Sequence, residues 1–176
     1  MTLGRATLIS ILAVLVGPRP DETVAWVAAV AAIVALCLDG VDGWLARKTQ
    51  TESDYGALLD MEVDSIFMML LCTLVLSWGY AGAWVLFCGL ARYLWLLTMA
   101  LLPWFRRPLE PAFRRKAACV VGIAGLALAL PPWPWGILNG LAASGATLAL
   151  AASFAVDIVW LIQRRHEPLE TDSTSH

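Results

Sequence analysis

The acidic residues of this chain are concentrated in one short stretch. Residues 39–64 hold half of the 14 Asp and Glu side chains. Within this stretch Asp39 and Asp42 are three positions apart, and Asp60 and Asp64 are four positions apart. Either spacing places two side chains on one face of an α-helix. Two helices that present such pairs to each other would supply hard oxygen ligands, which Mg²⁺ and Mn²⁺ prefer.

The flanking sequence makes this concentration of charge costly. Strongly apolar segments precede and follow it, and a carboxylate at membrane depth costs about 2.5–3.5 kcal/mol on insertion scales. Bound cations would offset this cost. The alternative is that the acids lie in the aqueous headgroup region, or pair with Arg47 and Lys48. The repeated helical spacing favours metal binding over this alternative.

The composition is typical of an integral membrane protein. Hydrophobic residues make up 60% of the 176 positions and charged residues 15%, against about 45–50% and about 25% in soluble domains. The apolar residues fall in continuous runs near the roughly 20 positions that a membrane-spanning helix needs. We predict an all-α integral membrane bundle of about six transmembrane helices, which forms one domain over residues 1–165. The polar tail at 166–176 is expected to be disordered.

Apolar runs and turn residues set the expected helix boundaries. The first run is short, is retained rather than cleaved as a signal peptide, and either spans the membrane or lies at its interface. Thr23 is the expected N-cap of the second helix. Residues 79–82 and the proline-rich residues 131–134 are expected turns, and residues 106–116 a basic connector. The expected helices cover residues 3–16, 23–46, 56–78, 83–105, 117–130 and 136–162.

The basic residues predict the orientation of this bundle. When the N-terminus is placed in the cytoplasm, only Arg19 of the 12 Lys and Arg residues lies on the outer side of the membrane, and Arg92 lies within a span. All others then lie on the inner side, as the positive-inside rule requires. We therefore expect both termini and the acidic stretch on the cytoplasmic side of the inner membrane.

The acidic stretch also forms one continuous motif, which reads Asp39-x2-Asp42-Gly43-x2-Ala46-Arg47-x8-Gly56-x3-Asp60-x3-Asp64. It resembles the full signature of the CDP-alcohol phosphatidyltransferase family, with each fixed residue and each spacing matched. The resemblance implies a membrane enzyme of phospholipid biosynthesis. Such an enzyme transfers the phosphatidyl group of a CDP-linked lipid, usually CDP-diacylglycerol, to an alcohol and releases CMP.

The resemblance also implies a role for each residue of the motif. Asp39, Asp42 and Asp60 bind divalent metal. Asp64 is the expected general base on the acceptor hydroxyl and a ligand of a second ion, so two Mg²⁺ or Mn²⁺ ions are expected. Two metals can stabilise the entering and leaving oxygens of a phosphoryl group, and an arginine can hold a phosphate through two hydrogen bonds. The residues expected to line the donor nucleotide are Gly43, Ala46, Arg47 and Gly56.

The acceptor is expected to contact basic residues outside the motif. Arg92 falls inside a span, so it should face a polar cavity or an acid, with Asp157 as the candidate partner. Arg92 and Lys116 resemble basic positions of the family's fourth and fifth spans. Together with Arg115 they could bind a phosphorylated acceptor. The basic cluster at 106–116 could equally anchor the protein to anionic lipid.

The basic cluster favours glycerol 3-phosphate as the acceptor, and hence an activity like that of phosphatidylglycerophosphate synthase. An inositol phosphate is the second choice, and serine or phosphatidylglycerol are further ones. Glu62 lies in an unconstrained gap of the motif and is expected to be a solvated or packing residue.

Two functions of other classes stay open. The acids could serve a divalent-cation carrier, although acids spread along a path through the membrane would then be expected. The chain could also be an inactive structural membrane subunit. Expected partners are the lipid donor, the alcohol acceptor, membrane lipid and, by resemblance, a second copy of the chain, but not nucleic acid.

Overall fold

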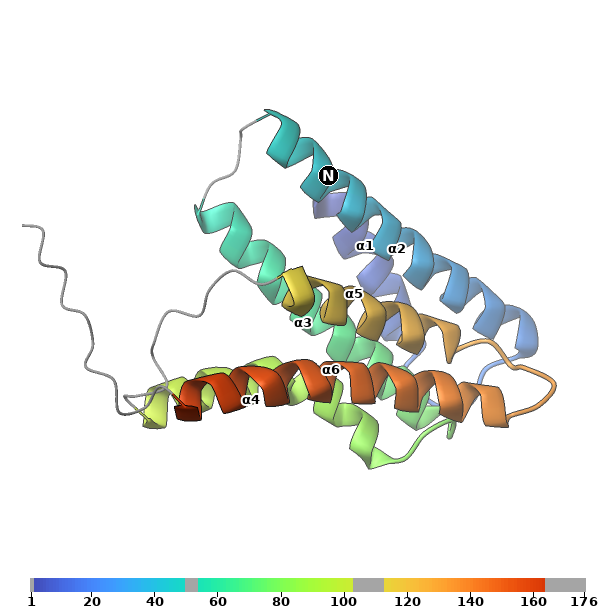
Figure 1. Cartoon of the computed structure of the whole chain (residues 1–176). Helices are drawn as coiled ribbons and strands as arrows, with labels where there is room; N and C mark the ends of the chain where they lie inside the picture. Colours follow the sequence, from blue (N-terminus) through green and yellow to red (C-terminus); the bar gives the residue numbers. More distant parts are fainter. Residues whose placement is uncertain (1, 50–53, 103–112, 164–176) are drawn as a thin grey trace, which may run out of the picture.

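The computed structural model describes the backbone of residues 2–49, 54–102 and 113–163, and the side chains of residues 7–41, 48, 61–102 and 117–163. Within these ranges the chain forms six α-helices and one short 3₁₀-helix, η1, and contains no strand (Figure 1). The predicted all-α bundle is thereby confirmed. The elements are α1 Thr2–Val14, α2 Glu22–Thr49, α3 Asp54–Ser77, η1 Ala83–Val85, α4 Leu86–Leu101, α5 Phe113–Leu128 and α6 Ile137–Gln163.

The six helices run alternately up and down the bundle. The connections from α1 to α2, from α3 to α4 and from α5 to α6 lie toward one end, on the right of Figure 1. The ends of α2, α4 and α6 lie toward the other end, together with the starts of α3 and α5. This arrangement brings the second half of α2 and the first half of α3, which carry the acidic motif, to the same end of the molecule.

Local hydrogen bonds explain where α2 begins and α3 ends. The Asp21 carbonyl accepts a hydrogen bond from the Ala25 amide at 3.0 Å, so Asp21 is the N-cap and the prediction of Thr23 is wrong. At the end of α3 the Tyr80 amide donates to the Val75 carbonyl at 3.0 Å. Between them Gly79 has a φ of +76°, the left-handed conformation of a Schellman C-cap. The predicted turn at 79–82 is therefore confirmed.

Two other predicted boundaries are wrong. The helix predicted over 83–105 ends at Leu101, and α5 begins at Phe113 rather than at residue 117. The last residues of the predicted basic connector at 106–116 thus form the first turn of α5, and residues 103–112 lie outside the described part. The segment from Phe113 to Lys116 contains neither Gly nor Pro, so it can be helical. Its high charge had suggested a loop.

Small residues allow the helices to pack closely. A Cβ atom on Gly89 of α4 would lie 2.7 Å from the Met69 Cα atom of α3. Similarly, α5 contacts α6 along its length, and α5 also packs against both α2 and α3. Such small-residue contacts are the usual means by which helices associate in membranes. The bundle is therefore held by close backbone approach as well as by its apolar core.

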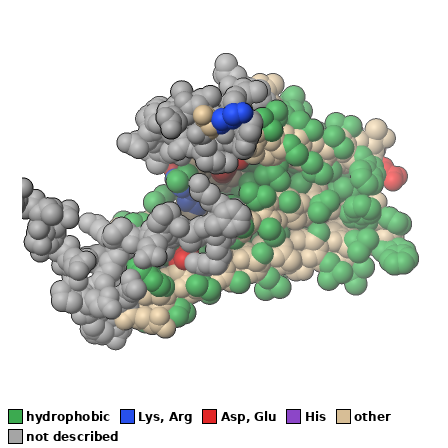
Figure 2. All heavy atoms as spheres, turned by 45° about the horizontal axis from the view of Figure 1, so that its top comes forward, with side chains coloured by type: hydrophobic (Ala, Val, Ile, Leu, Met, Phe, Trp, Pro, Cys, Tyr) green, Lys and Arg blue, Asp and Glu red, His purple; other side chains and the backbone are tan. Residues whose placement is uncertain are grey.

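The surface of the described part is largely apolar. Large hydrophobic side chains are exposed along several helices, as Val27, Leu97 and Leu148 illustrate, and Figure 2 shows them covering most of the described surface. Within the described residues, three segments are long and apolar enough to cross a membrane, namely Glu22–Val41, Ala83–Leu101 and Ile137–Gln163. A shorter apolar helix covers Ala117–Leu128. The structure therefore agrees with a membrane bundle, while passage of all six helices through the bilayer stays a prediction.

Candidate functional site

The four aspartates of the motif lie on two helices, as the spacing predicts. Asp39 and Asp42 belong to α2, and Asp60 and Asp64 belong to α3. Because both segments are helical, each pair shares a face of its helix. The side chains of Asp39 and Asp64 are partly buried, whereas those of Asp42 and Asp60 lie outside the described part.

The metal site itself stays a prediction. Among the side chains that the structure describes, no group of three or more His, Cys, Asp and Glu could hold a metal ion. Two of the four predicted ligands are not included in that search. The donor set fits the ions nonetheless, because carboxylate oxygens are the ligands that Mg²⁺ and Mn²⁺ prefer.

Helix α5 contacts both acid-bearing helices. It packs against α2 and against α3. Its Cys119 lies within electrostatic range of both Asp64 of α3 and Arg92 of α4. The predicted general base and the predicted acceptor-binding arginine therefore lie in the same part of the bundle, although they come from different helices.

The predicted nucleotide-binding residues lie on the same two helices. Gly43, Ala46 and Arg47 follow Asp42 along α2, and Gly56 lies in the first turn of α3. Each is within about two helical turns of a motif aspartate. Their side chains lie outside the described part, and their contact with a nucleotide stays a prediction.

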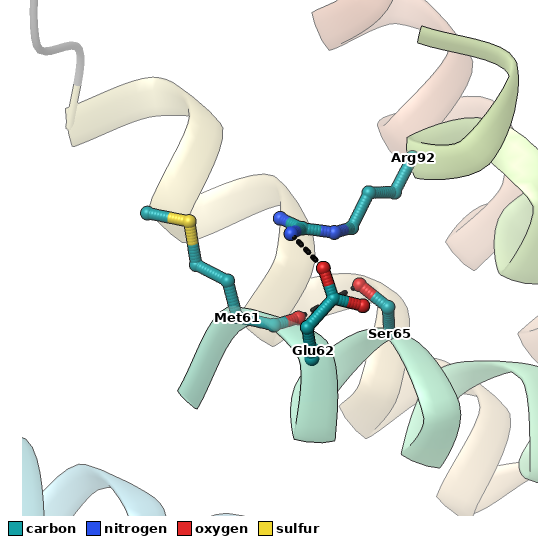
Figure 3. A network of polar contacts seen from close by, with 4 residues as sticks. All are labelled: Met61, Glu62, Ser65 and Arg92. Carbon is teal, nitrogen blue, oxygen red and sulfur yellow. Dashed lines mark hydrogen bonds and ion pairs between the residues drawn. The ribbon is translucent and has the colours of Figure 1, made fainter. Parts of the chain in front are cut away.

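Arg92 has a different partner from the one predicted. Its Nη2 atom donates to Oε1 of Glu62 in an ion pair of 2.5 Å. Figure 3 shows the guanidinium reaching from α4 across to Glu62 on α3. Asp157, the predicted partner, is buried on α6. Among the described residues, the ion pair of Arg92 is formed with Glu62 instead.

The same contact corrects the interpretation of Glu62 as a solvated or packing residue. Glu62 is two positions from Asp60 and from Asp64, and two positions turn a helix by about 200°. It therefore points away from the aspartate face and toward α4, which α3 contacts directly. One signal for this was present in the sequence, because an arginine inside a span needs an acid and Glu62 lies on the preceding helix.

Arg92 retains hydrogen-bonding capacity. Its Nε atom is buried and has no hydrogen-bond partner among the described groups. A guanidinium carries five N–H donors, of which the described contacts use one. The nearby Ser65 hydroxyl donates its hydrogen bond to the Met61 carbonyl at 2.8 Å, while the Glu62 carboxylate accepts from Arg92 (Figure 3).

The other predicted acceptor-binding residues lie at the start of α5. Arg115 and Lys116 belong to its first turn, not to a loop, and their side chains lie outside the described part. The bundle end that carries them also carries the motif (Figure 1). In Figure 2 basic and acidic side chains are visible in a hollow at this end.

Comparison with known proteins identifies the family. The family model described as CDP-alcohol phosphatidyltransferase matches residues 1–159. Neither the curated proteins nor the solved structures give a match. The matched range includes the whole acidic motif and reaches into α6. The chain therefore belongs to the CDP-alcohol phosphatidyltransferase family, membrane enzymes that transfer a phosphatidyl group from a CDP-alcohol to an alcohol acceptor.

Proposed function

We propose that this enzyme transfers the phosphatidyl group of CDP-diacylglycerol to a small polar alcohol and releases CMP. The observation that carries the proposal is the complete aspartate motif, divided between α2 and α3 at one end of the bundle. The family membership supports the same reaction class. The membrane domain proposed for it covers residues 1–165, with 166–176 as a tail.

The proposed reaction assigns separate tasks to the motif residues. Asp39, Asp42 and Asp60 would hold divalent metal, and Asp64 would accept the proton of the acceptor hydroxyl. A bound Mg²⁺ or Mn²⁺ would supply neutralisation of the pyrophosphate charge. Arg47 is suited to hold a phosphate oxygen pair of the donor. Gly43, Ala46 and Gly56 would leave room beside the backbone for the nucleotide.

The chemical step is a displacement at phosphorus. The acceptor oxygen forms a bond to the phosphorus that carries diacylglycerol, while the bond from this phosphorus to the bridging oxygen breaks. CMP leaves with the bridging oxygen and its electron pair. The proton of the acceptor hydroxyl passes to the Asp64 carboxylate, which must be ionised beforehand.

Glycerol 3-phosphate is the acceptor that the first turn of α5 supports. Arg115 and Lys116 lie there, at the bundle end that also carries the motif (Figure 1), and two cations suit a phosphate. Arg92 adds less to this argument than the sequence suggests, because Glu62 already pairs with it. An inositol phosphate fits the same two basic residues, whereas serine would leave them without a phosphate.

The proposed location is the inner membrane, with the motif on the cytoplasmic side. The apolar surface supports a membrane location, and the side rests on the distribution of Lys and Arg. A homodimer is proposed on the family resemblance.

The deciding experiment measures CMP release from CDP-diacylglycerol by the purified chain in lipid–detergent micelles with Mg²⁺ or Mn²⁺. Each of glycerol 3-phosphate, inositol phosphate, inositol, serine and phosphatidylglycerol is added alone. We expect release with one acceptor class and its loss in Asp64→Asn, while the exposed Glu22→Gln at the opposite end of the bundle stays active. A cation carrier or an inactive subunit would release no CMP with any acceptor, and this result would overturn the proposal.

A further inference from the structure

Asp157 is a buried acid of α6 that the proposed reaction does not use. Its side chain is only 6% exposed. It belongs to a row of buried residues along α6 that also contains Ala146, Leu150 and Ser153. A charge buried in a membrane bundle is costly unless an opposite charge or hydrogen-bond donors neutralise it. A basic residue close to Asp157 in the bundle would meet this need.

The arginine of α4 lies too far along the bundle to be that residue. Helices α4 and α6 run in the same direction (Figure 1), and the Cys88 thiol of α4 donates to the Thr147 hydroxyl of α6 at 3.3 Å. Arg92 is four residues beyond Cys88, whereas Asp157 is ten residues beyond Thr147. The difference of six residues corresponds to about 9 Å along the helices, in agreement with the pairing of Arg92 with Glu62.

The packing of α5 on α6 brings Arg114 to the level of Asp157. The two helices are antiparallel (Figure 1) and touch at Gly125, where a Cβ atom would lie 2.8 Å from the Ala146 Cβ atom. Asp157 lies 11 residues beyond Ala146, and Arg114 lies 11 residues before Gly125. Because α-helices rise equally per residue, the two positions lie at the same height of the bundle.

Helical periodicity also places the two positions on facing sides. Eleven residues complete three helical turns to within about 20°. Asp157 therefore lies on the same face of α6 as Ala146, and Arg114 lies on the same face of α5 as Gly125. These are the faces through which α5 and α6 touch. The juxtaposition of an acid with a basic residue thus follows from the backbone of the two helices.

The neighbours of Arg114 lie on other faces of α5. Arg115 and Lys116 follow it at about 100° and 200° around the helix axis. An ion pair between positions 114 and 157 would hold the first turn of α5 against α6 and leave these two residues to a ligand. One acid on α6 could in this way set the position of two cations on α5.

We propose that Asp157 is a positioning residue, which anchors the first turn of α5 through Arg114 and so sets where Arg115 and Lys116 meet the phosphate of the acceptor. The inference rests on the proposed function and adds a residue of α6 to it. Asp157 itself contacts neither substrate nor metal. Its effect is confined to the binding of a phosphorylated acceptor.

A double-mutant cycle on the melting temperature of the purified protein in detergent tests the pairing. Asp157→Asn and Arg114→Gln each leave one charge without its partner, and the combined variant removes both charges. We expect the combined variant to melt no lower than the less stable single variant, because an unpartnered buried charge is strongly destabilising. Exchange of the two residues, Asp157→Arg with Arg114→Asp, should recover part of the loss. Glu22→Gln, exposed on α2 at the other end of the bundle, should add independently to Asp157→Asn.

The kinetics of CMP release test the positioning role. Asp157→Asn should raise the KM for the phosphorylated acceptor, glycerol 3-phosphate first, about tenfold, the effect of losing one hydrogen bond to a charged group. The KM for CDP-diacylglycerol and kcat should stay nearly unchanged, since the residues proposed for the donor and the metal lie on α2 and α3. A merely structural role would lower the apparent kcat and leave both KM values as they are. Glu22→Gln should keep all three values.

Three outcomes would overturn the inference. Additive effects of Asp157→Asn and Arg114→Gln on the melting temperature would show that the two residues are not paired. Coupled residues with an unchanged KM for the acceptor would have a purely structural role. Use of an unphosphorylated acceptor alone would leave the first turn of α5 without the proposed task. Absence of CMP release by the native enzyme with every acceptor would instead overturn the proposed function, and the positioning role with it.

Discussion

Gly125 of α5 lies directly against Ala146 of α6. A Cβ atom built on Gly125 would come within 2.8 Å of the Ala146 Cβ atom and 3.2 Å of the Ala142 carbonyl oxygen. The absence of a side chain at Gly125 thus permits a close approach between these two helices. The start of the same helix carries Arg115 and Lys116.

The first prediction concerns this contact. Gly125→Leu should destabilise the protein by about 1–3 kcal/mol, because added side-chain atoms in a well-packed interface force backbone shifts. The melting temperature of the protein in detergent, measured by intrinsic tryptophan fluorescence, checks the expectation. Gly145→Leu on α6 is the matched control, since nothing lies within 4 Å of a Cβ atom there. Equal loss of stability in both variants would contradict the assigned role of Gly125.

The second prediction concerns the metal. Asp39→Asn should raise the Mg²⁺ or Mn²⁺ concentration needed for half-maximal CMP release by at least about tenfold, a loss of metal affinity that even residues outside the ligand shell can cause. A chelator should abolish release by the native enzyme, and added metal should restore it. Excess metal should also restore much of the Asp39→Asn activity.

Asp64→Asn provides the contrast to that variant. Its predicted loss is about 10²–10⁴-fold, the usual contribution of a general base, and excess metal should not reverse it. Measured CMP release over a metal titration separates the two variants. If metal rescued Asp64→Asn as fully as Asp39→Asn, Asp64 would be a ligand alone and the base would have to be sought elsewhere.

The third prediction concerns a buried amide at the opposite end of the bundle. The side chain of Asn139 is fully buried and donates to the carbonyls of Ala129 at 2.8 Å and Pro131 at 2.5 Å. It thereby satisfies carbonyls at the end of α5 and in the proline turn. Asn139→Ala should cost about 1–3 kcal/mol, because two acceptors lose their donor. The melting temperature reports the loss, and Ser144→Ala, near the surface of α6, should change it little.

The sequence predicts the helices, and which two of them carry the aspartates, for a simple physical reason. Long apolar runs must be helical in a bilayer, and helical spacing then fixes which side chains share a face. The ends of helices are harder to predict, because capping depends on single hydrogen bonds. Asp21 rather than Thr23 caps α2 for this reason, and the charged residues from Phe113 onward extend α5 instead of forming a loop.

The partner of Arg92 shows where prediction from sequence stops. Both Glu62 and Asp157 lie on helices that could face Arg92, and spacing within one helix does not tell which helices touch. Contact between α3 and α4 favours Glu62. That pairing also depends on how α3 and α4 pack, for instance at the close approach of Gly89 to Met69. Such a contact involves two helices, so the sequence of one of them does not predict it.

The final prediction concerns the contribution of the Glu62–Arg92 pair to stability. Arg92→Met alone and Glu62→Met alone each leave one charge without its partner, so each should lower the melting temperature more than the combined variant does. We expect a coupling free energy of about 1 kcal/mol, between the values for exposed and for buried pairs, because both side chains are partly exposed. A double-mutant cycle on the melting temperature in detergent measures it. Independent, additive effects would show that the two side chains do not depend on each other, and the ion pair between α3 and α4 would then contribute nothing to holding these helices in register.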